Sequence, residues 1–116
     1  MKVYVYNLMF NKMAAASKAC SVVGAELVTI SKDDIHKSVE HIIGESKNPK
    51  PMKDSNDSIT ELMIFDGFTS DSLDVFLDAY KQTKAPTILY KAMVTPINKK
   101  WSLTYLYSHL VKEAGH

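Results

Sequence analysis

The side chains that could do chemistry follow short apolar runs of the chain: Asn7, Asp66, Lys91, Thr95, Asn98 and Trp101. A lysine at the end of a strand could neutralise an anionic ligand. It could also act with a nearby carboxylate such as Asp66 as an acid/base pair. Thr95 and Asn98 could line a pocket, and Trp101 could stack on a ring-shaped ligand or on a partner protein.

Each of these residues also has a structural interpretation. Lys91 could be a surface lysine that extends its amine to solvent. Asp66 could cap the turn made with the glycine that follows it. Thr95 and Asn98 flank a proline and suit a rigid turn with side-chain bonds to the backbone. Trp101 precedes a predicted helix cap at Ser102, where it could form a hydrophobic staple. The structural interpretation is favoured for all five of these residues, Lys91 included.

The histidines and the cysteine give little support for metal or thiol chemistry. His36, Glu40 and His41 form a cluster, but their spacing does not match a known zinc motif. A solvated helix face explains them. Cys20 lies among small residues of a predicted helix with no histidine nearby in sequence, so we expect an inert core thiol. No metal site and no cofactor is predicted.

Composition and missing motifs exclude several classes of function. The formal net charge is +1 and all 14 basic residues are lysines, so neither nucleic acid nor an anionic membrane surface is an expected partner. Glycine-rich nucleotide-binding motifs and the G-x-S-x-G hydrolase motif are absent. One cysteine, no signal peptide and no long apolar run predict a cytoplasmic protein.

The apolar patterns predict two β-α-β-α halves within one domain, residues 1–116. Strands are expected at residues 3–8, 26–30, 62–65 and 87–90, bounded by turn-forming residues. Helices are expected at residues 12–23, from a cap at Ser31 to an end at Gly44, and after caps at Thr69 or Ser70 and at Ser102. A polar loop with two prolines, residues 45–58, joins the halves 1–44 and 59–116.

The halves resemble each other at a separation of about sixty residues, since YVYNLMF and LMIFDGF precede corresponding helices. In this alignment the stretch KAMVTPINKKW, residues 91–101, is an insertion. The α/β order predicts a four-stranded, mainly parallel sheet of order 2-1-3-4 with helices on both faces. Ligands bind such sheets at the carboxyl edge where the order reverses, which would bring Asn7 and Asp66 together beneath residues 91–101.

The C-terminal half resembles a small uncharacterised bacterial family known only as a domain of unknown function. The likeness rests on an apolar strand with a Gly-Phe turn and on a block K-A-x-x-T-P-x-N-x-x-W. The residues that match this block are Lys91, Ala92, Thr95, Pro96, Asn98 and Trp101. The resemblance covers about half of the chain and implies kinship without an activity.

The sequence therefore predicts a binding or interaction module whose site lies at the carboxyl edge of the strands. Its partner would be a small anionic ligand, another protein or a second copy of the chain. The alternative is a small enzyme that uses Asp66 and Lys91 as an acid/base pair. A receiver-like signalling domain is disfavoured, because Asn7 and Leu8 supply no acidic pair to hold Mg²⁺ after the first strand.

Overall fold

The computed structural model describes residues 1–45 and 59–114. In that part of the chain a four-stranded sheet is formed by β1 (Lys2–Tyr6), β2 (Glu26–Thr29), β3 (Leu62–Asp66) and β4 (Lys91–Met93). The α-helices are α1 (Phe10–Val23), α2 (Val39–Ile42), α3 (Ser70–Gln82) and α4 (Leu103–Ala114). Two 3₁₀ turns, η1 (Lys32–Asp34) and η2 (Asn98–Lys100), precede α2 and α4.

The predicted strand order is confirmed, but the prediction of a mainly parallel sheet is wrong. The order is β2-β1-β3-β4, and the outer pairs β1–β2 and β3–β4 are parallel. The central pair β1–β3 is antiparallel, with Lys2 opposite Asp66 and Tyr6 opposite Leu62. Each β-α-β crossover fixes the direction within its own half. No crossover of that kind joins β1 directly to β3, so the halves are free to pair in opposite directions.

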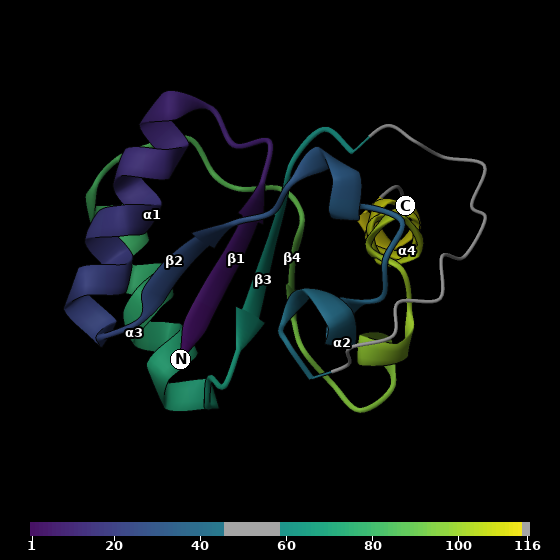
Figure 1. The fold of residues 1–116 in the computed structure, drawn as a ribbon. Helices are drawn as coiled ribbons and strands as arrows, with labels where there is room; N and C mark the ends of the chain where they lie inside the picture. Colours follow the sequence, from purple (N-terminus) through teal and green to yellow (C-terminus); the bar gives the residue numbers. More distant parts are fainter. Residues whose placement is uncertain (46–58, 115–116) are drawn as a thin grey trace.

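Helices cover both faces of the sheet, as predicted (Figure 1). Alternate residues of each strand point to opposite faces, so Val3 and Met63 enter the core beneath α1 and α3. Tyr4 and Ile64 enter the second core, beneath α2 and α4. The two cores are therefore separated by the sheet itself.

The first core is built by helices whose sequences suit close packing. Helix α1 buries small residues, including Ala16 and Ala19, which let it lie close to α3 and the sheet. Helix α3 begins with a capping box, in which Thr69 and Ser72 each accept a hydrogen bond from the other's backbone. Its buried Phe76 contacts Phe65 edge-on, with ring centroids 5.1 Å apart.

Two predicted elements differ in the structure. The helix expected between the Ser31 cap and Gly44 is broken into η1 and the short α2, each starting at a serine whose hydroxyl accepts a backbone hydrogen bond. The fourth strand was expected at residues 87–90 but forms at Lys91–Met93. Only Ile88 of the expected segment is buried, where it packs into the core as part of a loop.

The expected insertion at residues 91–101 is also wrong, because the extra residues precede β4. Residues 30–38 and residues 94–102, nine in each case, connect β2 to α2 and β4 to α4. Two residues, 24–25, connect α1 to β2, whereas eight, 83–90, connect α3 to β4. The segment 83–90 is therefore what distinguishes the second half from the first.

The equivalent connections of the two halves pair with each other. Ser38 and Ser102 form an antiparallel bridge. On either side of it, Val39 N–H donates to the Trp101 carbonyl at 2.8 Å and Leu103 N–H donates to the Lys37 carbonyl at 3.1 Å. These bonds join the halves on the α2/α4 face, while the β1–β3 pairing joins them within the sheet.

The polar loop predicted at residues 45–58 lies, apart from Glu45, outside the described residues. Among residues 1–45 and 59–114, the helices are all too short or too polar to cross a bilayer.

Candidate functional site

The structure does not bring Asn7 and Asp66 together. Because β1 and β3 run antiparallel, their carboxyl ends lie at opposite edges of the sheet. Asn7 shares its edge with the start of β3 and β4, and Asp66 shares the other edge with Lys2. The expectation of one carboxyl edge that carries both residues is therefore wrong.

Asn7 stabilises the chain where it enters β3. Its side-chain amide donates to the carbonyl of Thr60 at 2.9 Å and to that of Ile59 at 3.3 Å. Its backbone has a φ of 58°, in the left-handed region that asparagine tolerates better than most residues. The amide thus connects the end of β1 to the segment that leads into β3.

Asp66 and Lys91 are separated along the sheet as well. Lys91 pairs with Met63 in the β3–β4 register, three residues before Asp66, which corresponds to about 10 Å along a strand. The Lys91 amine instead donates to the carbonyl of Ile88 at 2.5 Å. This arrangement gives no support to an acid/base pair made of these two residues.

Thr95 and Asn98 form a closed turn after β4. Thr95 N–H donates to Asn98 Oδ1 at 2.8 Å, and Asn98 N–H donates to Thr95 Oγ1 at 3.0 Å. The Asn98 amide also donates to the Met93 carbonyl at 2.8 Å. Asn98 is buried, so these contacts account for the polar atoms of its side chain.

Trp101 lies against α4 on the far side of the sheet from the Lys91 side chain. It packs on the α2/α4 core, whereas Lys91 shares its face with Met63 and the α1/α3 core. Its ring lies 4.9 Å from that of Tyr105 and 5.1 Å from that of His109, centroid to centroid. The predicted cap at Ser102 is confirmed, because Ser102 Oγ accepts a hydrogen bond from Tyr105 N–H.

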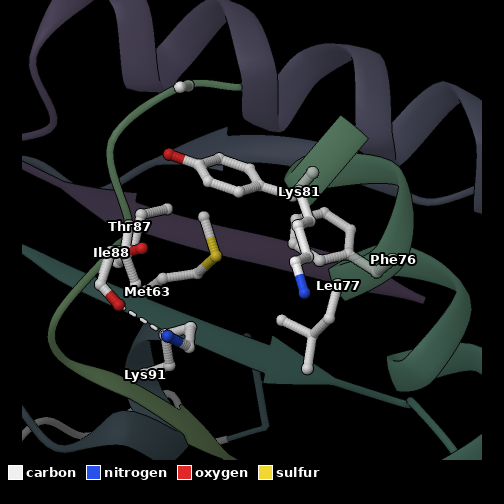
Figure 2. Close-up of a pocket in the computed structure, with 9 residues that line it drawn as sticks. Met63, Phe76, Leu77, Lys81, Thr87, Ile88 and Lys91 are labelled. Atoms are coloured by element: carbon white, nitrogen blue, oxygen red, sulfur yellow. Dashed lines mark hydrogen bonds between the residues drawn. The ribbon is translucent and has the colours of Figure 1, made fainter. Parts of the chain in front are cut away.

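A cleft of about 210 Å³ lies between α3, the start of β4 and the segment 83–90 (Figure 2). Its lining combines apolar side chains with two lysines, and the described residues that line it include no carboxylate. They are Met63, Phe76, Leu77, Tyr80, Lys81, Ala85, Thr87, Ile88 and Lys91. Of the sequence-predicted site residues, Lys91 is the one placed in this cleft.

Specific contacts hold the segment 83–90 in place as one wall of the cleft. The Tyr80 hydroxyl donates to the carbonyl of Pro86 at 2.7 Å. Burial and the Glu61 charge raise the pKa of Tyr80, which keeps this phenol protonated as a donor. Ile88 is 2% exposed, and Leu89 N–H donates to Glu61 Oε2 at 2.6 Å. The segment 83–90 is thus held in place at Pro86, Ile88 and Leu89.

Behind this wall lies a buried ion pair between Lys12 of α1 and Glu61. The Lys12 amine lies 2.5 Å from Glu61 Oε1, and the two side chains are 9% and 10% exposed. With Oε2 bonded to Leu89 N–H, both carboxylate oxygens of Glu61 have partners. A pair of this kind tolerates burial because each charge is compensated by the other and by further hydrogen bonds.

Among the described residues, no carboxylate is bonded to Lys91. Burial lowers the pKa of its ammonium group; the Glu61 charge opposes this shift and the Lys12 charge adds to it. Lys12 and Lys91 are thus two cations close to a single carboxylate, that of Glu61, which is bonded to Lys12. An additional negative charge in the cleft would therefore be stabilised.

The pair Lys12–Glu61 was not predicted from the sequence, although the position of Lys12 on an apolar helical stripe indicates that it is buried. Lys12 lies on the same helical stripe as Ala15, Ala16 and Ala19, the buried face of α1. A lysine on such a face requires a buried partner. Glu61 directly precedes the apolar strand β3, and a charged residue at that position is typical of a solvent-exposed strand end.

The remaining candidates show no site. Cys20 is buried as predicted, and burial raises its thiol pKa to about 11, which leaves it a poor nucleophile at neutral pH. Within residues 1–45 and 59–114, no three or more His, Cys, Asp or Glu side chains are grouped so as to hold a metal ion.

Comparison with known proteins bears on the second half of the chain. Neither the curated proteins nor the solved structures gave a match to this sequence. Among family models, a match begins at Glu61 and runs from β3 through α4, so it includes Lys91 but not Lys12. Residues 61–114 match the family described as Domain of unknown function (DUF3783), which supports the kinship expected from the C-terminal sequence.

Proposed function

We propose that this protein is a binding module for a small molecule that has an apolar body and one anionic group, held in the cleft beside Lys91. The observation that carries the proposal is the partly buried Lys91 ammonium, whose hydrogen-bond acceptor is a neutral carbonyl. Buried charges in proteins are normally paired. A ligand carboxylate would supply the missing partner.

The size of the cleft limits the ligand. Its volume of about 210 Å³ is below the roughly 300–1,000 Å³ of pockets for drug-sized ligands. It exceeds the roughly 150 Å³ of an apolar cavity that holds benzene. A ligand with a single ring or a short branched chain therefore fits, with Phe76, Leu77 and Met63 against its apolar part.

The test compares benzoate with benzamide, which has nearly the same shape but no charge. We expect benzoate to raise the melting temperature and benzamide to do so less, because ligand bound to the native state stabilises it. A charge-assisted hydrogen bond contributes about 1.5–3 kcal/mol, which corresponds to roughly 10–100-fold in affinity. Calorimetric titration of both compounds measures this ratio.

Two variants with the same change in charge provide the control. Lys91→Met removes the half-buried cation of the cleft, whereas Lys112→Met removes one from the exposed end of α4. We expect Lys91→Met to lose the preference for benzoate and Lys112→Met to retain it. Equal binding of benzoate by both variants, with circular dichroism unchanged, would contradict the proposal.

The pH dependence provides a second test. Because the pKa of Lys91 lies below its ordinary value of 10.5, the ammonium loses its charge at a lower pH than an exposed lysine. Benzoate affinity is expected to be highest at neutral pH and to fall as pH rises toward 10.5. Affinity that stays constant across this range would exclude Lys91 as the partner of the anion.

A further inference from the structure

The amine of Lys91 is positioned for a reaction as well as for charge pairing. It lies at the floor of the cleft, opposite the side chains of Phe76 and Leu77 (Figure 2). One of its N–H groups is directed to the Ile88 carbonyl at 2.5 Å. In the neutral amine this bond leaves the lone pair free, because a carbonyl oxygen accepts a hydrogen bond and cannot donate one.

A second amine reaches the same cleft from the opposite side. Lys81 extends from α3, and Figure 2 shows its nitrogen across the cleft from that of Lys91. Lys81 is exposed, and Lys91 is half-buried. The exposed Lys81 amine is accessible to a ligand carboxylate, while burial lowers the pKa of the half-buried Lys91 amine so that it releases its proton more readily. The two lysines therefore suit different groups of one ligand.

We propose that Lys91 forms a reversible imine with a small aldehyde or ketone that also carries a carboxylate, such as a 2-oxo acid. This inference rests on the proposed function, because the same cleft must first bind the anion. It specifies the chemical class of the ligand further. The ligand would have a carbonyl group that lies within reach of the Lys91 amine when its carboxylate lies beside Lys81.

The reaction balances without a further co-reactant. The lone pair of the neutral Lys91 Nζ attacks the carbonyl carbon, and the C=O π electrons move to the oxygen. A proton passes from the nitrogen to that oxygen, which gives a carbinolamine. The hydroxyl group then leaves as water, and the remaining N–H proton is lost, so that a C=N bond replaces the C=O bond.

The surroundings of Lys91 favour this step in two ways. A lysine becomes nucleophilic when it is desolvated, and burial acts on Lys91 in that direction as the largest effect on its pKa, although the Glu61 charge opposes it more than the Lys12 charge adds to it. Binding in the cleft also holds the carbonyl near the amine, which raises its effective concentration. Glu61 is bonded to Lys12 and to Leu89 N–H, so it is not free to hold the Lys91 ammonium as a direct ion pair.

The test is reductive trapping of the native full-length protein. The protein is incubated with 4-carboxybenzaldehyde or phenylpyruvate, and sodium cyanoborohydride converts any imine to a stable secondary amine. Peptide mapping by mass spectrometry then compares labelling of lysine side chains. We expect Lys91 to be labelled at least about tenfold more than Lys112, because binding in the cleft raises the effective concentration of the carbonyl group at the Lys91 amine. Comparable labelling of these two lysines would overturn the proposal.

Three further measurements separate the imine from simple binding. Lys91→Arg keeps a cation that cannot form an imine, so it should still bind benzoate but give no adduct at position 91. In the unaltered protein, excess benzoate should suppress labelling of Lys91, and denaturation should abolish its preference over Lys112. Benzoate binding without preferential labelling would refute the imine alone, whereas absence of both would refute the proposed function too.

Discussion

Replacing Lys12 by methionine should destabilise the protein strongly, because it leaves the Glu61 carboxylate buried without its counter-ion. The two side chains are 9% and 10% exposed, with Nζ and Oε1 2.5 Å apart. Removing one partner of such a pair costs about 3–5 kcal/mol. At about 4 °C per kcal/mol for a domain of this size, the melting temperature should fall by roughly 12–20 °C. Urea unfolding followed by circular dichroism gives the free energy directly.

The exposed ion pair between Lys100 and Glu40 provides the matched control. Its atoms are 3.0 Å apart, but the side chains are 65% and 21% exposed. Lys100→Met is therefore expected to cost at most about 1 kcal/mol. If Lys12→Met proved no more destabilising than Lys100→Met, the assignment of the Lys12–Glu61 pair as a buried structural contact would be wrong.

A second substitution should restore part of the lost stability. Glu61→Gln removes the uncompensated charge and keeps an oxygen that can accept the hydrogen bond from Leu89 N–H. We expect the double variant Lys12→Met/Glu61→Gln to lie within about 1–2 kcal/mol of the unaltered protein. A double variant less stable than Lys12→Met alone would refute this reasoning, since the buried charge could not then be the source of the cost.

Further predictions concern positions outside the cleft. Asn98→Ala removes the side-chain bonds with Thr95 N–H and the Met93 carbonyl and should cost about 1–3 kcal/mol by urea unfolding; Thr95→Ala removes a single bond, that from Asn98 N–H to Thr95 Oγ1, and should cost less. Gly67→Ala should cost about 1 kcal/mol, since φ is +77° there although space exists for a methyl group. Cys20 should not react with a disulfide reagent at pH 8 until the protein unfolds. With its pKa raised to about 11, its stabilising contribution is complete below pH 9 and is lost as pH rises through 11, a loss that Cys20→Ala should remove.

The layers of this fold could be predicted because buried residues recur at regular intervals in the sequence. The stripe formed by Leu73, Phe76, Leu77 and Tyr80 predicts α3 and its buried face, and the alternating order of strands and helices predicts helices on both faces of a sheet. The direction of β1 relative to β3 does not change the spacing of apolar residues. A strand has the same alternation whichever way its neighbour runs, so the mixed sheet could not be inferred from these patterns.

The position of β4 differs from the predicted one because the apolar run that precedes β4 forms a packed loop. Residues 87–90 read TILY and end just before β4, and Lys91-Ala92-Met93 resembles a strand less. In the structure the first segment serves as a wall, with Ile88 in the core and Leu89 exposed. An apolar run indicates that a segment is buried, but it does not distinguish a strand from a loop that packs on a core.

The candidate site could be predicted only in part, since Lys91 was identified from its type and position but its neighbours were not. Thr95, Asn98 and Asn7 have contacts that explain them structurally. Lys12 and Glu61 are 49 residues apart in sequence, and their contact follows from how α1 packs beside β3. Pairing of this kind is a tertiary property that a single sequence does not reveal.

The unequal connections of the two halves have a consequence for stoichiometry. Both halves supply a strand, a helix and a second parallel strand, so a symmetric protein would offer two equivalent clefts. In the first half the corresponding wall would have to come from Gly24 and Ala25, which offer no more than one methyl group between them. The longer segment 83–90 supplies Thr87 and Ile88 to the second half alone. A titration should therefore saturate at one ligand per chain, with one class of binding sites.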